Sequence, residues 1–131
     1  MSVRKLKTTE VKKVREELLR LQGDVCALTR YPLDPKDAVL DHDHKTGLTR
    51  AVLHRGVNAL LGKLENNHAR YGVSLPQMLA MGRGLEAYLK TDYSHMPLHP
   101  THKTTEEKRI IRNAKARASR ARKKADLSVP D

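Results

Sequence analysis

The fold of this 131-residue chain depends on residues 38–72, which read AVLDHDHKTGLTRAVLHRGVNALLGKLENNHARYG. Two short runs typical of extended structure lie on either side of a turn sequence at Gly47, which predicts a β-hairpin. Directly after the hairpin, large aliphatic side chains recur at helical spacing over residues 57–64, and Gly72 supplies a stop signal. We therefore predict the local order strand, strand, helix, with the helix over residues 56–70.

Helices are also predicted on both sides of this stretch. Residues 8–23 carry apolar side chains at helical spacing, with a Thr start and a Gly stop. Residues 24–36 show no period, so we expect an irregular loop there. A further helix is predicted from Ser74, because Ser74 and Gln77 have the spacing of a capping box, although two glycines inside this helix weaken it.

The C-terminal part of the chain has a different composition. Residues 103–125 contain ten Lys and Arg residues against two Glu, and their large apolar residues are Ile110 and Ile111. A capping box opens at Thr104, so we expect a basic helix that cannot bury a core of its own and that becomes ordered on a partner. The predicted division is a folded domain at 1–95 with its motif core at 26–70, a linker at 96–103 and a basic helical tail at 104–131.

Composition limits the possible functions. The chain has no Phe, no Trp and four Tyr, so its core must be small and a large enzyme fold is excluded. Its 26 Lys and Arg against 15 Asp and Glu give a net charge of +11, which favours a nucleic acid partner.

The sequence also bears on the cellular compartment. A single cysteine, Cys26, forms no intramolecular disulfide, so we expect a reducing compartment, the cytosol. We expect neither a signal peptide nor a membrane span, and the tail lacks the broad apolar face of a membrane-binding helix.

The candidate site lies at the end of the first predicted strand. It contains Asp41, His42, Asp43 and His44, with Asn58 early in the helix that follows. Carboxylate and amide oxygens suit Mg²⁺ or Mn²⁺, and an imidazole can take a proton from water near neutral pH. Phosphodiester hydrolysis uses both functions. Strand alternation separates the aspartates from the histidines unless the strand ends or twists there, so a solvated hairpin tip is the alternative interpretation of these residues alone.

Several residues within segment 26–65 follow one another in a characteristic order. They are Asp41, His42, His44, Thr46, Gly47, Arg50, Asn58, Leu61 and Gly62. In this order and spacing the segment resembles the recombination endonuclease VII group of HNH nucleases. The resemblance implies an α+β fold: a small ββα-metal (HNH, His-Me finger) hairpin-helix core with flanking α-helices, to which this chain adds its basic C-terminal helix.

The resemblance also implies an activity. It is that of a metal-dependent DNA endonuclease acting on branched DNA such as four-way junctions. Asp41 and Asn58 would hold Mg²⁺, for which Mn²⁺ can substitute. His42 would act as the general base, and His44 would orient or contact the scissile phosphate. Cutting two strands of a junction requires two active sites, so a homodimer is implied, with the first helix or the tail as its contact. The resemblance also implies that the chain is a phage protein that works in the bacterial cytosol.

The chain departs from the family at its zinc site. The family carries two Cys-x-x-Cys motifs, which here read Cys-Ala-Leu-Thr from Cys26 and His-Arg-Gly-Val from His54. Structural zinc has four Cys or His ligands, so Cys26 and His54 alone are too few and we expect the zinc to be lost. We predict instead that Cys26 is a small buried residue, that Val57 packs into the vacated space and that His54 is structural.

Basic residues supply the predicted DNA contacts. Lys45 and Arg50 flank the hairpin and are expected to contact phosphates without reading bases. The tail adds eight more candidates: Arg109, Arg112, Lys115, Arg117, Arg120, Arg122, Lys123 and Lys124.

Two other functions fit the same sequence. One is an HNH nicking or homing endonuclease that acts on ordinary duplex, and the other is a catalytically inactive basic DNA-binding module.

The remaining polar residues have simpler interpretations. Glu65 lies within possible reach of the metal, but we interpret residues 65–68 as a solvated helix face. We assign His95, His99 and His102 to the linker.

Overall fold

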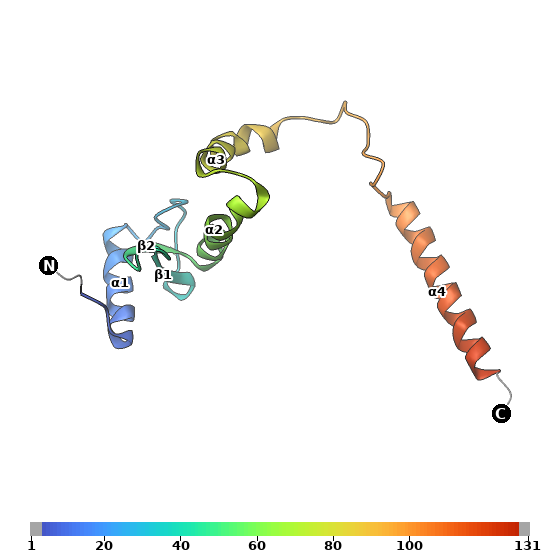
Figure 1. Ribbon diagram of the computed structural model, residues 1–131, viewed down its shortest axis with the longest axis horizontal. Helices are drawn as coiled ribbons and strands as arrows, with labels where there is room; N and C mark the ends of the chain where they lie inside the picture. Colours follow the sequence, from blue (N-terminus) through green and yellow to red (C-terminus); the bar gives the residue numbers. More distant parts are fainter. Residues whose placement is uncertain (1–3, 129–131) are drawn as a thin grey trace. The chain divides into compact units, whose positions relative to one another are not determined.

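The computed structural model describes residues 4–128 (Figure 1). Residues 1–3 and 129–131, at the ends of the predicted domain and tail, lie outside the described residues. The chain divides into two units, Met1–Leu89 and Lys90–Asp131. Each unit is described by itself below.

The described part of the first unit contains three α-helices and one two-stranded antiparallel sheet, an α+β architecture. Its elements are η1 (Thr8–Glu10), α1 (Val11–Leu21), η2 (Pro35–Asp37), β1 (Ala38–His42), β2 (Thr49–His54), α2 (Arg55–Asn67), η3 (His68–Tyr71) and α3 (Leu75–Lys90). The predicted helices and the hairpin are confirmed. The helix from Ser74 runs through both of its glycines, and its capping box forms, with Ser74 Oγ accepting from the Gln77 backbone and Gln77 Oε1 accepting from the Ser74 backbone.

The hairpin contains an irregularity next to the candidate site. β1 and β2 pair with Ala38 opposite His54, Leu40 opposite Val52 and His42 opposite Thr49. The register shifts between Leu40 and His42, so Asp41 stands at a β-bulge. A bulge disrupts the regular alternation of side chains and changes their direction. The hairpin is therefore irregular beside Asp41, and strict alternation of side chains does not apply there.

The turn of the hairpin follows its residue types. Gly47 has a positive φ of 77°, a conformation that side chains with a Cβ rarely adopt. Its backbone N–H donates to the Asp43 carbonyl at 2.7 Å. The Asp43 carboxylate accepts from the backbone N–H groups of Lys45 and Thr46 at 2.8 and 3.1 Å. Asp43 is thus used by the turn, and these hydrogen bonds, the one from Thr46 above all, lower the pKa of its carboxyl.

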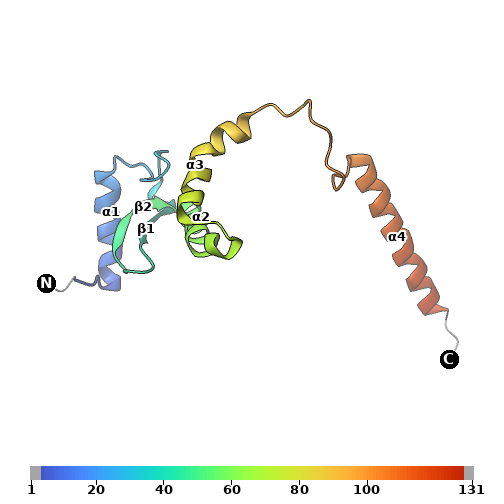
Figure 2. The same cartoon turned by 45° about the horizontal axis from the view of Figure 1, so that its top comes forward.

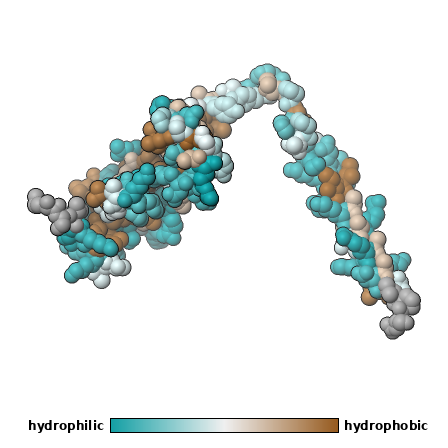
Figure 3. All heavy atoms as spheres, viewed as in Figure 1, coloured by the Kyte–Doolittle hydropathy of each residue, from teal (hydrophilic) through white to brown (hydrophobic). Residues whose placement is uncertain are grey.

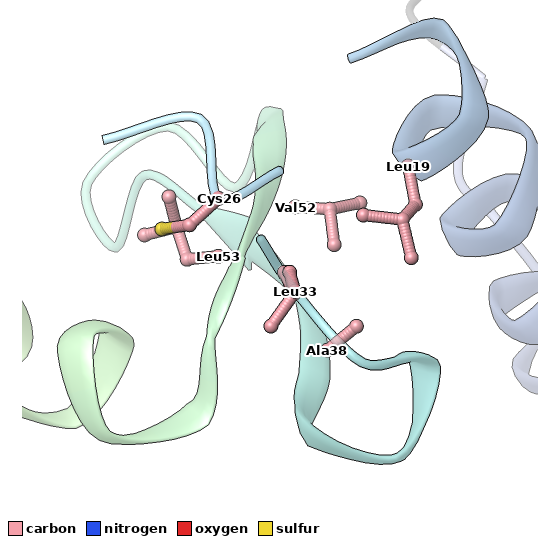
Figure 4. Close-up of a cluster of buried hydrophobic side chains, with 6 residues drawn as sticks. All are labelled: Leu19, Cys26, Leu33, Ala38, Val52 and Leu53. Carbon is pink, nitrogen blue, oxygen red and sulfur yellow. The ribbon is translucent and has the colours of Figure 1, made fainter. Parts of the chain in front are cut away.

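The core of the first unit is small, as the lack of Phe and Trp predicts. The hairpin lies between α1 and α2 (Figures 1 and 2). Six buried apolar side chains form the core (Figure 4): Leu19, Cys26, Leu33, Ala38, Val52 and Leu53. Val52 points toward Leu19 of α1, and Leu53 lies beside Cys26 (Figure 4). Val57 packs against this cluster, in agreement with its predicted role.

A glutamine connects α1 to the hairpin. Gln22 follows the last residue of α1, and its side-chain amide donates to the Val25 and Val52 carbonyls at 3.0 and 2.9 Å. Its Oε1 accepts from the Val52 backbone N–H at 2.8 Å. One side chain therefore satisfies three backbone groups of two other segments, which fixes the end of α1 against β2.

The second unit contains α4 (Thr105–Leu127). The capping box predicted at Thr104 forms, with Thr104 Oγ1 accepting from the Glu107 backbone and Glu107 Oε2 accepting from the Thr104 backbone. No residue of α4 is buried. Figure 3 shows this helix as hydrophilic apart from a narrow apolar strip. The helix is therefore held by its own hydrogen bonds and by no packed face.

Candidate active site

Asp41 is the one buried polar residue of the described chain. Only 6% of its surface is exposed. Its Oδ2 accepts a hydrogen bond from Arg50 Nε at 2.6 Å, and the two side chains form an ion pair. A buried carboxylate requires such a partner, because desolvation of an unpaired charge is costly. The shift in register sets Asp41 of β1 against two residues of β2, of which Arg50 is one, so the extra residue of the bulge lies in β2.

Arg50 also binds Glu65, which comes from α2. Nη1 and Nη2 of Arg50 donate to the two Glu65 oxygens at 3.1 and 2.8 Å. The two hydrogen bonds with Glu65, and then the one with Asp41, raise the pKa of Arg50 above its ordinary value. We call these three residues the Asp41–Arg50–Glu65 cluster. Its two carboxylates and one guanidinium carry a net charge of −1 in a chain whose net charge is +11.

The interpretation of Glu65 as a solvated position is therefore wrong. Its side chain is 31% exposed and binds Arg50, which is 15 residues away in sequence. No helical periodicity reveals this contact, since it depends on how α2 packs against the hairpin. Charge pairing could have indicated this contact in the sequence. An Arg on the second strand needs an acidic partner where its side chain is withdrawn from solvent.

His42 and His44 are exposed and lie beside each other. Their ring centroids are 4.7 Å apart. His42 also lines a groove of about 1000 Å³ between the N-terminal segment, α1 and the hairpin, together with Arg4 and Lys5. Asp41 and His42 are adjacent in sequence, yet Asp41 contacts β2 and, through Arg50, α2, whereas His42 borders this groove. The structure thus places the predicted metal ligand and the predicted base in different surroundings.

Asn58 lies in the first turn of α2 and is half-buried. The residue before this helix is His54, whose Nδ1 accepts from the Gly56 backbone N–H at 3.0 Å and so caps the helix. Within residues 4–128 no hydrogen bond or ion pair joins Asn58 to Asp41. The Asn58 amide is therefore not committed to another described side chain.

The oxygen donors of this region suit a small hard cation. Mg²⁺ is usually held by one or two carboxylates, with water and substrate phosphate as its other ligands. Asp41 offers Oδ1, since only Oδ2 is bonded to Arg50, and Asn58 offers its amide oxygen. Among the described residues no group of three or more His, Cys, Asp or Glu side chains is arranged to hold a metal ion. Asp41 and Asn58 would thus leave the other positions of such an ion to water and phosphate.

The two remaining zinc-motif residues have structural contacts. Cys26 is 1% exposed, and its Sγ accepts from the His54 backbone N–H at 3.4 Å. Burial raises the pKa of the Cys26 thiol, but hydrogen bonds from Thr29 and from the backbone of His54 and Leu28 outweigh burial and lower this pKa to about 7. His54 caps α2, as its predicted structural role requires.

The predicted DNA-binding residues fall into two groups. Arg50 belongs to the cluster, whereas Lys45 is exposed on the hairpin turn. The eight basic residues predicted on the tail all lie on α4 and are all exposed: Arg109, Arg112, Lys115, Arg117, Arg120, Arg122, Lys123 and Lys124. Arg109 pairs with Glu106 at 2.6 Å within its own helix.

Comparison with known proteins identifies the family. The sequence profile of the recombination endonuclease VII family matches residues 2–78, which include α1, the hairpin and α2. The chain belongs to this family of endonucleases, as its sequence motif predicted. Among curated proteins no sequence matches the chain. Within residues 4–128, no helix combines the length and apolar character needed to cross a membrane.

Proposed function

We propose that this protein is a metal-dependent DNA endonuclease of the ββα-metal type that hydrolyses phosphodiester bonds in branched DNA such as four-way junctions. The observation that carries the proposal is the buried Asp41 carboxylate at the bulge of the hairpin, in a cluster with a net negative charge. A negative buried site in a strongly basic chain favours a cation, while the rest of the chain favours a polyanion. Membership of the endonuclease VII family supports the same activity.

Each residue of the site has a proposed role. Asp41 and Asn58 hold Mg²⁺, or Mn²⁺ in its place, through oxygen atoms. The bound ion would neutralise charge on the phosphate and on the leaving oxygen. His42, exposed beside the groove, accepts a proton from the attacking water. His44, whose ring lies next to that of His42, orients the scissile phosphate.

The basic helix increases affinity for DNA without reading its sequence. The eight basic side chains of α4 are exposed on a helix that buries nothing, and Lys45 on the hairpin turn is exposed as well. Contacts of this kind go to phosphates. Each phosphate neutralised lowers the slope of log K against log salt by about 0.9. Binding is therefore expected to weaken steeply as salt rises.

The working form is a homodimer. Two strands of a four-way junction must be cut, and each chain supplies one site. The described chain exposes about half of four large apolar side chains on α3, which a second copy would cover: Leu75, Leu79, Met81 and Leu85. We therefore propose α3 as a further candidate for the contact, beside the first helix and the tail. Analytical ultracentrifugation checks the mass in solution.

The decisive experiment compares a labelled four-way junction with a linear duplex of the same sequence. Wild type and His42→Ala are tested with Mg²⁺ and with a chelator. We expect the junction to be cut far faster than the duplex, only by wild type and only with Mg²⁺. Equal cutting of both DNAs would identify a nicking or homing endonuclease. Binding of both without cutting in Mg²⁺ or Mn²⁺ would identify an inactive DNA-binding module.

A further inference from the structure

We propose that Arg50 is a displaceable counter-ion: it neutralises Asp41 before a divalent cation binds, and Glu65 then keeps its guanidinium at the site. This inference rests on the proposed function, because it presumes that the cation binds Asp41. It gives Arg50 and Glu65 positioning roles, since both act on the cation through Asp41.

The hydrogen bonds of Arg50 allow such a movement. Nε holds Asp41 Oδ2 at 2.6 Å, while Nη1 and Nη2 hold the two oxygens of Glu65 at 3.1 and 2.8 Å. The two carboxylates therefore bind separate edges of the guanidinium. If the bond to Asp41 breaks, the two bonds to Glu65 can persist. Arg50 can thus release Asp41 and stay anchored to α2.

The charges of the cluster create the competition. Asp41 is 6% exposed, so water screens its charge poorly and a cation must compensate it. Arg50 supplies this cation in the described structure. A divalent ion on the same carboxylate would be repelled by a guanidinium that stayed 2.6 Å from Oδ2. The affinity for the ion therefore depends on how easily Arg50 withdraws.

Glu65 makes the withdrawal easier in two ways. Its carboxylate attracts Arg50 away from Asp41, and it leaves the cluster with a net charge of −1 instead of zero. After the exchange, Arg50 has donors to offer. A guanidinium has five N–H groups, of which three are bonded to the two carboxylates here. The side chain is 34% exposed, so the released and unused donors are open to a phosphate oxygen.

Lysine at position 50 would not reproduce this arrangement. An ammonium group is a compact point charge and lacks the planar fork that binds one carboxylate with two parallel bonds. It could neutralise Asp41, but it could not hold Glu65 in the same two-bond geometry while doing so. Arg50→Lys therefore keeps the positive charge at position 50 and removes the two parallel hydrogen bonds to Glu65.

The test is a titration of the full chain, free of DNA, with Mn²⁺ as the probe. Bound Mn²⁺ is measured by electron paramagnetic resonance, and folding of each variant is checked by circular dichroism. The variants are Arg50→Gln, Arg50→Lys and Glu65→Gln. Lys63→Gln is the matched control, because it removes one cation from an exposed position of α2 outside the cluster.

We expect Arg50→Gln to bind Mn²⁺ roughly tenfold more tightly than wild type, because the competing cation is gone. Glu65→Gln should bind it roughly fivefold more weakly, since Arg50 then stays on Asp41 and the net charge is zero. Lys63→Gln should stay within about twofold of wild type, as an exposed charge is well screened. A role of Arg50 in folding alone would not tighten cation binding.

The outcomes separate the two proposals. If wild type binds Mn²⁺ and Arg50→Gln binds it no more tightly than Lys63→Gln, the counter-ion role is overturned and the metal site stands. If neither wild type nor Arg50→Gln binds Mn²⁺, the metal site fails and both proposals fall. Should Arg50→Gln not fold, Arg50→Lys decides. It keeps the competing charge and loses the two-bond anchor to Glu65, so weaker binding than in Lys63→Gln supports the role, and unchanged or tighter binding overturns it.

Discussion

The hairpin with α2 and the helix α4 both carry many charges, but they use them differently. In the hairpin region the charges that are withdrawn from solvent have specific partners, as Asp41 has in Arg50 and Arg50 has in Glu65. On α4 the basic side chains are exposed, and among the described residues Arg109 alone has an acidic partner, Glu106. Partnered buried charges act through geometry, so their effects are individual and large. Exposed charges act through their sum, so their effects are small and interchangeable.

The largest effect is expected at Asp41, the buried charge with a specific partner. Asp41→Asn keeps the size of the side chain but removes its charge, and we expect cleavage to fall about 10³-fold, equivalent to about 4 kcal/mol of transition-state stabilisation. Asp37→Asn, on the exposed η2 helix, is the control and should cleave like wild type. Single-turnover cleavage of a junction measures both. Cleavage by Asp41→Asn at the wild-type rate would show that the cluster is not the active site.

The next effect concerns stability instead of cleavage. Gln22→Ala removes the partner of the Val52 backbone N–H and of the Val25 carbonyl, while the Val52 carbonyl keeps its bond from the Ala27 backbone N–H, and we expect the free energy of unfolding to fall by about 2 kcal/mol. Urea denaturation followed by circular dichroism measures the loss. Lys13→Ala, at an exposed position of α1, is the control and should change stability little. A loss as small as that of the control would mean that Gln22 does not hold α1 to β2.

A pH-dependent effect follows from Cys26. Its pKa is about 7 in the folded chain, against 9.0 for an ordinary thiol. Between these values the folded protein holds a thiolate and the unfolded chain holds a thiol, so stability should rise with pH over this window and be lost as pH falls through 7. We expect a gain of about 1–2 kcal/mol from pH 6.5 to 9 that is missing in Cys26→Ala. Parallel pH profiles in the two proteins would refute the lowered pKa.

The smallest effects are expected on α4. Arg117→Gln should weaken binding to any DNA by about twofold and reduce the salt slope by about 0.9. Arg120→Gln should do the same, because neither side chain has a specific partner among the described residues. Fluorescence anisotropy at several salt concentrations measures both. If one of the two variants lost binding to junctions alone, α4 would be reading structure and would resemble the hairpin region more than we infer.

Local patterns in the sequence were sufficient to predict most elements. The turn at Gly47, the capping boxes at Ser74 and Thr104, and the periodicity of α2 depend on residues a few positions apart, and all of them form. The glycines inside α3 did not interrupt it, because each lowers helix propensity by only about 1 kcal/mol. The buried state of Cys26 was predicted as well, since an unpaired thiol in an apolar loop packs like a small aliphatic side chain.

Contacts between distant residues could not be predicted. Gln22 binds Val52 across 30 positions, and Arg50 binds Glu65 across 15. Both depend on the way helices pack against the hairpin, which no local pattern contains. The bulge beside Asp41 is similar: the sequence left open whether the strand ends or twists there, and the shift in register came only from the pairing of β1 with β2.

The small core makes the stability of the chain depend on bound ligands. Burial of six side chains, none of them aromatic, stabilises the fold by little more than the conformational entropy that folding costs. The folded fraction is then set by mass action as well as by packing. A ligand present at 100 times its Kd adds about 2.7 kcal/mol to the free energy of unfolding. DNA or a divalent ion would thereby protect the nuclease from proteolysis, and the amount of intact enzyme would follow the amount of substrate.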